Sequence, residues 1–419
     1  MSITILKGQI LHAPVFGELE SIKDGFLVCE NGKIEGLYQT LPERFSGAPV
    51  EDFGDNLITP SFADLHLHAP QYSMLGMGMD LPLLDWLQTY TFPAESRFAD
   101  LDFAREAYKK LANALVSVGT TRVCMFSSLH REATHILMEE LDRAGVSGYV
   151  GKVNMDRNCP DYLCEDTQQS ISETLRWLEE CEGRYKNIRP ILTPRFVPSC
   201  TDELMKAIGK LAQEKNLPQQ SHLSENPSEV EWVRELTGCE YYYEGYSRFG
   251  LFGEKTVMAH CVYSDERERA AMRDNGVWVA HCPDSNMNIV SGIAPVRQML
   301  NEGVKVALGS DIAGGAHLNI MDVMTDAIRS SKARYMQTEG KDAFLTAAEA
   351  FYLATSAGAM FFGAGPGFKA GDLLHALVID ETNLPPSAAP LSPEQRLERI
   401  LYLKGDIVAR FSEGKKIGL

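Results

Sequence analysis

The chain has 419 residues, a formal net charge of −17, 44% hydrophobic residues and 23% charged residues. This composition is typical of a soluble globular protein. The length exceeds the roughly 250–300 residues over which one core keeps growing, so we expect a large domain and a smaller one. The acidic balance argues against nucleic acid or an anionic membrane as a partner, because phosphate contacts need a basic surface. A neutral small-molecule substrate is compatible with this charge.

Three features of the sequence bear on location. It has no apolar stretch of the roughly 18 residues that a transmembrane helix needs. The first residues, MSITILKGQILHAP, lack the charged, apolar and cleavage regions of a signal peptide. The nine cysteines include no CxxC pair, which favours reduced thiols over a disulfide framework. We therefore expect a cytoplasmic protein.

Both ends of the chain are rich in short strand patterns. Residues 25–37 predict a hairpin in which Asn31-Gly32 suits the positive φ of a type I′ turn. Residues 372–380 and 407–411 show similar apolar strand patterns near the other end. We predict a small β-sandwich domain made of residues 1–58 and 371–419, with a catalytic domain at residues 59–370 inserted between its halves.

Between the ends, apolar strands alternate with amphipathic helices, a pattern that predicts βα units around parallel strands. The expected strands are residues 57–68, 120–128, 148–155, 188–196, 218–225, 256–263, 278–286 and 305–311. The expected helices include residues 102–118, 170–182, 202–216, 264–275 and 295–302. Eight such strands favour a (β/α)8 TIM barrel. A doubly wound sheet is the alternative, but no Gly-rich dinucleotide turn follows the first strand.

One segment, residues 69–98, breaks this alternation. It is rich in Met, Gly and aromatic residues and has no clear period. We expect a long loop or lid at the mouth of the barrel.

His66 and His68 lie two residues apart on the first expected barrel strand. Residues at this spacing point to the same side of a strand, roughly 7 Å apart, so both imidazoles can reach one metal ion. The alternative is an alternating strand that carries two hydrogen-bonded histidines. Five of the other seven expected strands end in Arg195 with Phe196, His222 with Glu225, His260, His281 and Asp311. Because the chemistry of TIM barrels lies at the carboxyl ends of the strands, this distribution favours a site.

Imidazoles and a carboxylate form a mixed nitrogen and oxygen donor set. This set suits Zn²⁺ or Fe²⁺ better than Mg²⁺ or Ca²⁺, which prefer oxygen ligands. The lack of thiolates at these strand ends favours a catalytic ion, which makes hydroxide available near neutral pH. The reaction class is then metal-assisted hydrolysis at an electrophilic carbon. Glu225 follows His222 by three residues and can serve as a proton shuttle, or as an acid that stabilises a helix N-terminus.

At this point the motifs resemble those of the amidohydrolase superfamily. The strings that carry this resemblance are HLH (66–68), SHLSE (221–225), MAH (258–260) and GSD (309–311). Longer strings resemble the guanine-deaminating branch of that family: HAPQY (68–72), DLPLLDWLQTYTFPAE (80–95), TPRFVPSC (193–200), QSHLSEN (220–226), AHCVYSD (259–265), AHCPDSN (280–286) and GSDIAGG (309–315).

The resemblance implies one Zn²⁺ per chain, with Fe²⁺ as an alternative. Its implied ligands are His66, His68, His222 and Asp311. His260 would orient the attacking hydroxide without being a ligand. Where dinuclear relatives carry a carbamylated lysine, this chain has Arg195 and Phe196, which argues for a single metal ion.

The resemblance also implies an activity, the hydrolytic deamination of guanine to xanthine and ammonia. Glu225 and Asp311 would take the proton of the attacking water, and Glu225 would return a proton to N3 of the ring. Gln71, Arg195 and Phe196 would bind the purine. From the residues alone, Phe196 could equally be core filler and Arg195 half of an ion pair. The resemblance further implies a homodimer.

Two other functions are alternatives. A related aminohydrolase could act on a pterin, a triazine or an adenosine-type ring. A non-catalytic scaffold of the same fold is the second alternative, but every expected ligand position is filled. His281 receives no role in this interpretation, although it ends an expected strand.

Overall fold

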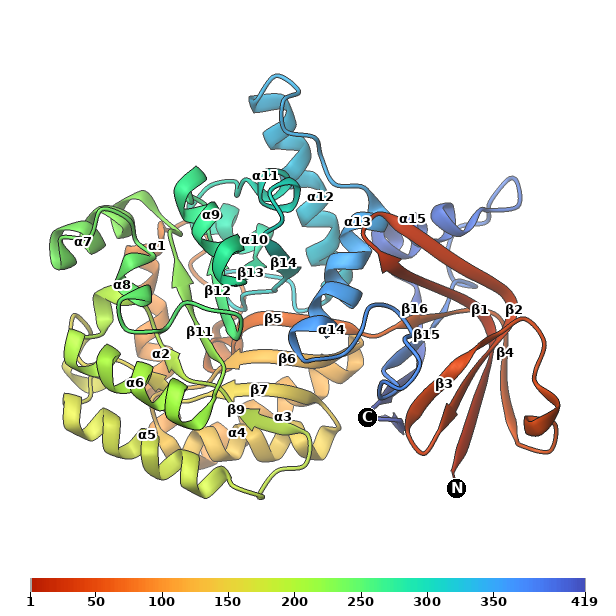
Figure 1. Cartoon of the computed structure of the whole chain (residues 1–419), viewed down its shortest axis with the longest axis horizontal. Coiled ribbons are helices and arrows are strands. Elements are labelled where there is room, and N and C mark those ends of the chain that lie inside the picture. The colour runs from red at the N-terminus through yellow and green to blue at the C-terminus, as the bar shows by residue number, and fades with distance from the viewer. Residues whose placement is uncertain (1, 419) are drawn as a thin grey trace.

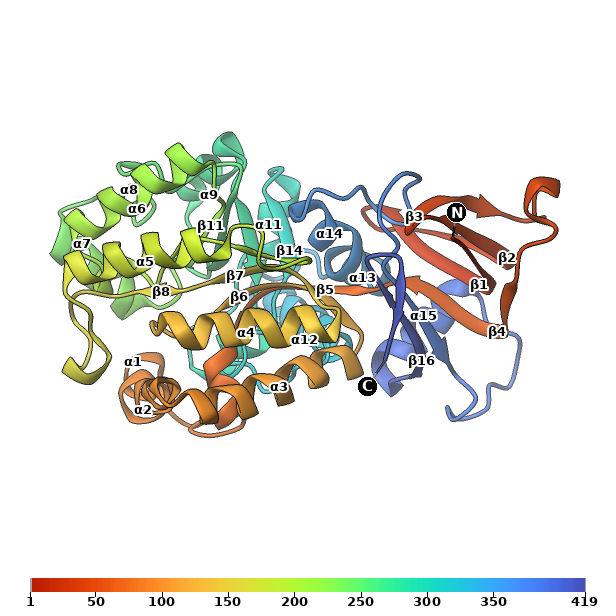
Figure 2. The same ribbon diagram turned by 90° about the horizontal axis from the view of Figure 1, so that it is seen from below.

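The computed structural model describes residues 2–418 and contains a barrel beside a smaller sheet. Both views show the two units side by side, with the two chain ends at the sheet (Figures 1 and 2). Among residues 2–418, no helix has the length and apolar character needed to cross a membrane.

The smaller unit is one seven-stranded sheet in the order β17-β16-β15-β4-β1-β2-β3. Its strands are β1 (Ile3–Val15), β2 (Glu18–Glu30), β3 (Lys33–Tyr38), β4 (Val50–Pro60), β15 (Ala376–Asp380), β16 (Asp406–Ser412) and β17 (Lys415–Ile417). We expected a sandwich of separate sheets. The strands instead form a single sheet, because β15 pairs with β4 and so extends the N-terminal strands. Apolar side chains from both chain ends, including Leu27 and Phe411, share one core.

The barrel consists of parallel strands. They are β5 (Phe62–His68), β6 (Thr120–Phe126), β7 (Ser147–Gly151), β8 (Val153–Asn154), β9 (Ile188–Pro190), β10 (Thr193–Pro194), β11 (Gln219–Leu223), β12 (Thr256–His260), β13 (Trp278–His281) and β14 (Lys305–Leu308). The N–H of Asp311 donates to the carbonyl of His66 at 2.8 Å, which joins the segment after β14 to β5. The N–H of Gln220 in β11 donates at 3.0 Å to the carbonyl of Leu192, which lies between β9 and β10. This bond joins β11 to the strands that precede it in the chain. These bonds close the α/β barrel that the strand pattern predicts.

The observed barrel strands differ in their bounds from the predicted ones, and two of these differences have a clear physical cause. Residues 57–68 are not one strand, because β4 ends at Pro60 in the small sheet and β5 begins at Phe62 in the barrel. Between them the N–H of Ser61 donates to the carbonyl of His375 at 3.2 Å. The strand expected at residues 278–286 ends at His281, because Pro283 begins a helix at a position where its missing N–H costs nothing.

Helices surround the barrel and bury their apolar faces against it. They are α3 (Leu101–Ser117), α4 (Arg131–Ala144), α5 (Thr167–Cys181), α6 (Asp202–Lys215), α7 (Pro227–Thr237), α8 (Glu244–Ser247), α9 (Glu266–Asn275), α10 (Pro283–Asn288), α11 (Val296–Asn301), α12 (Ile320–Gln337), α13 (Ala347–Tyr352) and α14 (Gly358–Phe361); α15 (Pro393–Leu403) packs near the sheet. Asp100, Asp166 and Thr201 cap the first turns of α3, α5 and α6 through their side-chain oxygens.

The segment at residues 69–98 is largely helical rather than a loop. It contains a 3-10 helix (Ala69–Met74), α1 (Leu83–Trp86), a π-helix (Leu87–Thr91) and α2 (Phe92–Ser96), followed by a 3-10 turn (Arg97–Ala99). Trp86 and Phe92 are buried. The N–H of Leu83 donates to the carbonyl of Ile289 at 3.1 Å, so this segment is tied to the loop after α10.

Candidate active site

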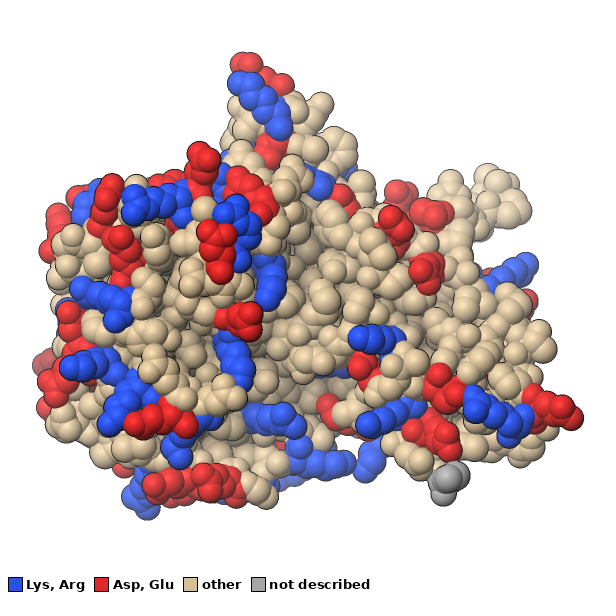
Figure 3. All heavy atoms as spheres, viewed as in Figure 1, with Lys and Arg blue, Asp and Glu red and all other residues tan. Residues whose placement is uncertain are grey.

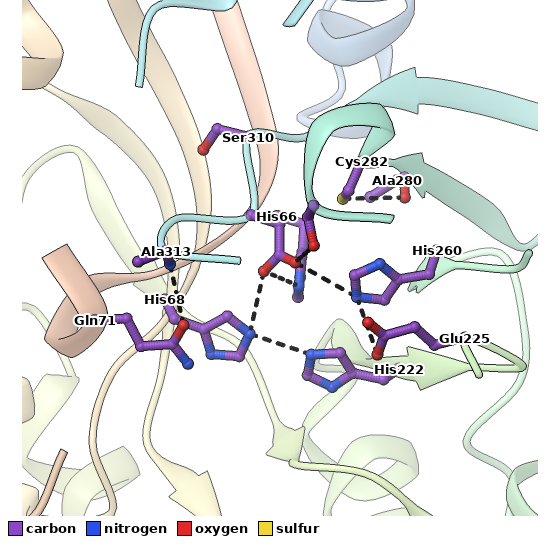
Figure 4. A network of polar contacts seen from close by, with 12 residues as sticks. His66, His68, Gln71, His222, Glu225, His260, Ala280, Cys282, Ser310 and Ala313 are labelled. Atoms are coloured by element: carbon purple, nitrogen blue, oxygen red, sulfur yellow. Dashed lines mark hydrogen bonds and ion pairs between the residues drawn. The ribbon is translucent and has the colours of Figure 1, made fainter. Parts of the chain in front are cut away.

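Four imidazoles and one carboxylate converge at the carboxyl ends of the barrel strands (Figure 4). The Nε2 atom of His66 lies 3.2 Å from Oδ1 of Asp311. The Nε2 atom of His68 lies 3.1 Å from Nε2 of His222 and 3.6 Å from Oδ1 of Asp311. The structure therefore brings together the four residues that the sequence proposed as ligands, and places His260 beside them.

The second nitrogens of two rings show how these histidines are oriented. Nδ1 of His222 lies 2.6 Å from the carbonyl oxygen of Arg195, and Nδ1 of His260 lies 2.9 Å from Oδ1 of Asn286. Both partners are acceptors, so each Nδ1 carries the proton and each Nε2 offers a lone pair to the cluster. Nε2 of His66 is buried and has no hydrogen-bond partner among residues 2–418.

This donor set fits a transition-metal ion. Ligand atoms around a tetrahedral zinc ion are about 3.4 Å apart, given bonds of about 2.1 Å. The distance of 3.1 Å between the Nε2 atoms of His68 and His222, and those of 3.2 and 3.6 Å from His66 and His68 to Asp311, are close to that separation. His260 forms a second group of potential ligands with His66 and His222. Its Nε2 lies farther from the carboxylate, at 3.8 Å from Oδ2 of Asp311.

Asp64 is a buried residue of this region that the sequence analysis did not single out. Its carboxylate accepts hydrogen bonds from the N–H of His66 at 3.2 Å and from the N–H and hydroxyl of Ser310 at 2.9 and 2.5 Å. It therefore joins the end of β5 to the residue before Asp311. The hydroxyl of Ser285 also donates to Asp311. The available sequence signal for Asp64 was an acid among the apolar residues Phe62, Ala63 and Leu65 of β5.

Glu225 extends into the cluster. Its Oε2 lies 3.5 Å from Nε2 of His260, and the hydroxyl of Ser291 donates to its Oε1 at 3.4 Å. Burial raises the pKa of Glu225 well above its ordinary value, and the charge of Asp311 raises it further. Asn226 and Glu229 form the capping box of α7, so Glu225 is not itself the capping residue of that helix. Glu229 also accepts the N–H of Glu225 at 3.0 Å, which holds that backbone in place.

Backbone strain is concentrated at the same strand ends. Ser224, His260 and Asp311 have positive φ angles of 47°, 73° and 47°. Such conformations cost on the order of 1–3 kcal/mol each for residues other than glycine. Three of them around one cluster is typical of a functional site, where side-chain direction outweighs backbone preference.

A pocket adjoins the cluster and contains the three residues predicted to bind a purine. Gln71, Arg195 and Phe196 line it together with His68, His222, Glu225, His260 and Asp311. Its apolar wall is made of Leu83, Trp86, Leu87 and Ile289. Three of these four residues belong to the helical segment at residues 69–98, which therefore covers the site.

Glu95 links two of the pocket residues and was missed in the sequence analysis. The Arg195 guanidinium donates to its two oxygens at 2.6 and 3.1 Å, and Nε2 of Gln71 donates to Oε1 at 2.9 Å. The N–H of Ala313 donates to Oε1 of Gln71 at 3.0 Å, which fixes the orientation of that amide. Arg195 is therefore both half of an ion pair and part of the pocket wall. The only sequence signal was the position of Glu95 at the end of the string at residues 80–95.

His281 lies outside this site. Its side chain faces a separate pocket with Val296 of α11 and with Ser330 and Arg334 of α12. Burial lowers the pKa of His281 to about 3. The position of His281 at the end of β13 therefore did not show on which face of the strand its side chain lies.

The fold and the site define a metal-dependent hydrolase class, and comparison with known proteins agrees. Residues 57–382 match the model of the amidohydrolase family, and the chain belongs to this family. It is similar to the guanine deaminase of Dictyostelium discoideum, with 40% identity over 85% of this chain and 83% of that protein. It is 36% identical to the guanine deaminase of Homo sapiens over 86% of this chain and 82% of that protein. The crystal structure of guanine deaminase from C. acetobutylicum with bound guanine superposes with a TM-score of 0.97 and 42% identity over 100% of both chains.

Proposed function

We propose that this protein is a zinc-dependent guanine aminohydrolase that converts guanine and water to xanthine and ammonia. The observation that carries the proposal is one pocket whose wall holds both the imidazole–carboxylate cluster and the Glu95-linked pair Arg195 and Gln71. The similarity to guanine deaminases over nearly the whole chain supports the same function.

In this proposal His66, His68, His222 and Asp311 hold one zinc ion, with Fe²⁺ as the alternative because this donor set accepts either. A bound ion of this kind supplies a Lewis acid that activates water near neutral pH. His260 orients the attacking water through its Nε2 and is not a ligand. Its distance from Asp311 and its hydrogen bond to Asn286 support this role.

Glu225 moves the proton. Its carboxylate takes a proton from the attacking water while the oxygen bonds to C2 of guanine, and it delivers that proton to N3. Asp311 shares the proton at the start of this step. Collapse of the tetrahedral carbon forms the C2 carbonyl and breaks the bond to the exocyclic nitrogen, which takes up the second proton of the attacking water and leaves as ammonia. The burial of Glu225 and its contact with His260 support this role.

Arg195, Gln71 and Phe196 select the ring. Phe196 offers an apolar face, and Arg195 donates to O6 of guanine. The 6-amino group of adenine is a donor, so adenine would leave both this group and Arg195 without a partner in a buried pocket. One N–H of the Gln71 amide donates to Glu95, and this bond fixes the direction in which the second N–H of the amide points.

Ammonia release from the purified protein tests the proposal. Guanine is expected to release ammonia, whereas a pterin, a triazine and adenosine are expected to release little. Turnover of one of those rings without turnover of guanine would reject the substrate but keep the reaction class. Metal analysis of the same sample is expected to give about one zinc per chain.

The homodimeric state and the cytoplasmic location are predictions carried over from the sequence. Light scattering coupled to size-exclusion chromatography tests the first, and fractionation of cells that produce the protein tests the second.

A further inference from the structure

A second polar pocket lies at the end of the barrel opposite the active site. At the carboxyl end of β6, Phe126 packs against His66 and His68, with its ring centroid 4.6 Å from that of His68. Arg122 lies near the amino end of the same strand and lines a pocket of about 330 Å³. The pocket is bounded by the starts of β7 and β9 and by the small sheet, so it is separate from the catalytic cluster.

Arg122 is a buried cation without a partner. Its residue is only 9% exposed, yet its guanidinium makes no hydrogen bond or ion pair with any residue between 2 and 418. Burial lowers the pKa of Arg122 to about 10. A guanidinium so placed is costly unless a group of opposite charge meets it, because charges lose favourable hydration on burial.

The nearby carboxylates already have other donors. Glu413 lies 3.3 Å from Nε2 of His375, and Asp372 accepts the N–H of Gly365 at 2.6 Å. Neither approaches Arg122 within ion-pair distance. They lower the positive potential of the pocket without satisfying the directed donors of the guanidinium.

The pocket wall is cationic in a chain that is strongly acidic overall. Four cationic side chains line it, against the carboxylates of Asp372 and Glu413: Lys33, Arg122, Lys186 and Arg189. Contact with Lys186 lowers the pKa of the neighbouring Lys415, so a fifth cation adjoins this group. Figure 3 shows Lys and Arg side chains gathered at the lower junction between the barrel and the small sheet. Ser147 and Asn187 add polar groups to the same wall.

We propose that this pocket binds a phosphate group, free or as the monoester of a small metabolite, with Arg122 as its buried anchor and Arg189 at its rim. Arg presents a planar fork of N–H donors that matches phosphate oxygens. The volume of about 330 Å³ exceeds what one phosphate occupies, so a monoester also fits. The site would lie outside the deaminase reaction and would bind independently of guanine.

Thermal unfolding of the metal-loaded full chain tests the proposal. Inorganic phosphate at about ten times its dissociation constant is expected to raise the Tm by about 1–3 °C relative to sodium chloride of equal ionic strength. Calorimetric titration with inorganic phosphate and with ribose 5-phosphate distinguishes the two sources: tighter binding of the ester favours a metabolite, and equal binding favours free phosphate. Both results would support the site.

Variants assign the effect to this pocket. Arg122→Met and Arg189→Met should each lower phosphate affinity by tenfold or more and keep guanine turnover. The control Arg176→Met, on the exposed face of α5, should change neither.

Without phosphate, Arg122→Met should be at least as stable as the parent, because it removes an unpaired buried charge. Arg189 is exposed, so its variant carries the test if Arg122→Met fails to fold. Equal responses to phosphate and chloride, or a phosphate response that persists in Arg189→Met and in any folded Arg122→Met, would overturn the proposal.

Discussion

Glu95 and Arg195 form a two-point ion pair in which both side chains are only 3% exposed. Glu95 belongs to the segment that covers the barrel mouth, whereas Arg195 follows β10 of the barrel. The pair therefore connects the cover of the pocket to its floor. Because Gln71 donates to the same carboxylate, one acidic side chain orients both polar residues proposed to bind the purine.

Glu95→Gln is expected to lower kcat/KM for guanine by about 10²-fold, because small misplacements of substrate-orienting groups have effects of this size. It should also lower the free energy of unfolding by about 3–5 kcal/mol, since Arg195 stays buried without its counterion. Bound zinc should not change. The matched control is Glu302→Gln, which breaks the two-point pair with Arg269; neither residue lines the pocket, so the kinetics should stay unchanged. Normal guanine kinetics in Glu95→Gln would contradict the orienting role.

Glu225→Gln is expected to keep its zinc and to lose turnover by about 10²–10⁴-fold, the usual contribution of a general acid–base group. The amide keeps the shape of the side chain but cannot accept and return a proton. Ammonia release and metal content are measured on the same preparation. If the variant retained substantial turnover, another group would have to move the proton.

Asp64→Asn is expected to weaken zinc binding by about 10–100-fold, because residues that support metal ligands commonly contribute this much. The carboxamide cannot accept all three hydrogen bonds that Asp64 receives from His66 and Ser310. Competition with a chromophoric chelator measures the affinity. Asp156→Asn is the control, because Asp156 likewise accepts a backbone N–H and hydroxyls, from Thr201 and Thr167, outside the cluster. Unchanged affinity in Asp64→Asn would remove Asp64 from the support of the ligands.

His375 is expected to make stability depend on pH between about 6.5 and 4. Burial, and then the charge of Arg122, lower the pKa of His375 from 6.5 to about 4. In that range the unfolded chain binds a proton that the folded chain does not bind, so this stability is present above pH 6.5 and is lost as pH falls. The difference corresponds to ~3 kcal/mol at full effect. His375→Gln should therefore show a smaller fall in Tm from pH 7 to pH 4.5 than the parent; identical falls would contradict the assignment.

The barrel and the imidazole–carboxylate cluster could be predicted because each rests on a simple spacing rule. Apolar strands alternating with helices define the βα units, and chemistry follows their carboxyl ends. His66 and His68 share one side of β5, so the structure brings them together as the two-residue period requires.

Glu95 could not be predicted for a different physical reason. It lies in a segment of 3-10, α and π turns, which have no common period that a sequence pattern could reveal. Its function depends on the bond to Arg195, 100 residues later in the chain. The break between β4 and β5 was missed because the parts of both strands that fall within residues 57–68 are largely apolar, although Pro60, the last residue of β4, was an available signal.

The pairing of β4 with β15 has a consequence for folding during synthesis. β4 is an inner strand of the small sheet, but its neighbour β15 is made only after the entire barrel. Strands β1 to β4 therefore leave the ribosome before the barrel, but their sheet is completed after it. Until β15 arrives, β4 presents an unpaired edge that another nascent chain can join. Protein truncated after residue 370 should therefore aggregate in sedimentation assays. In the full chain, pairing with β15 ends the exposure of the β4 edge.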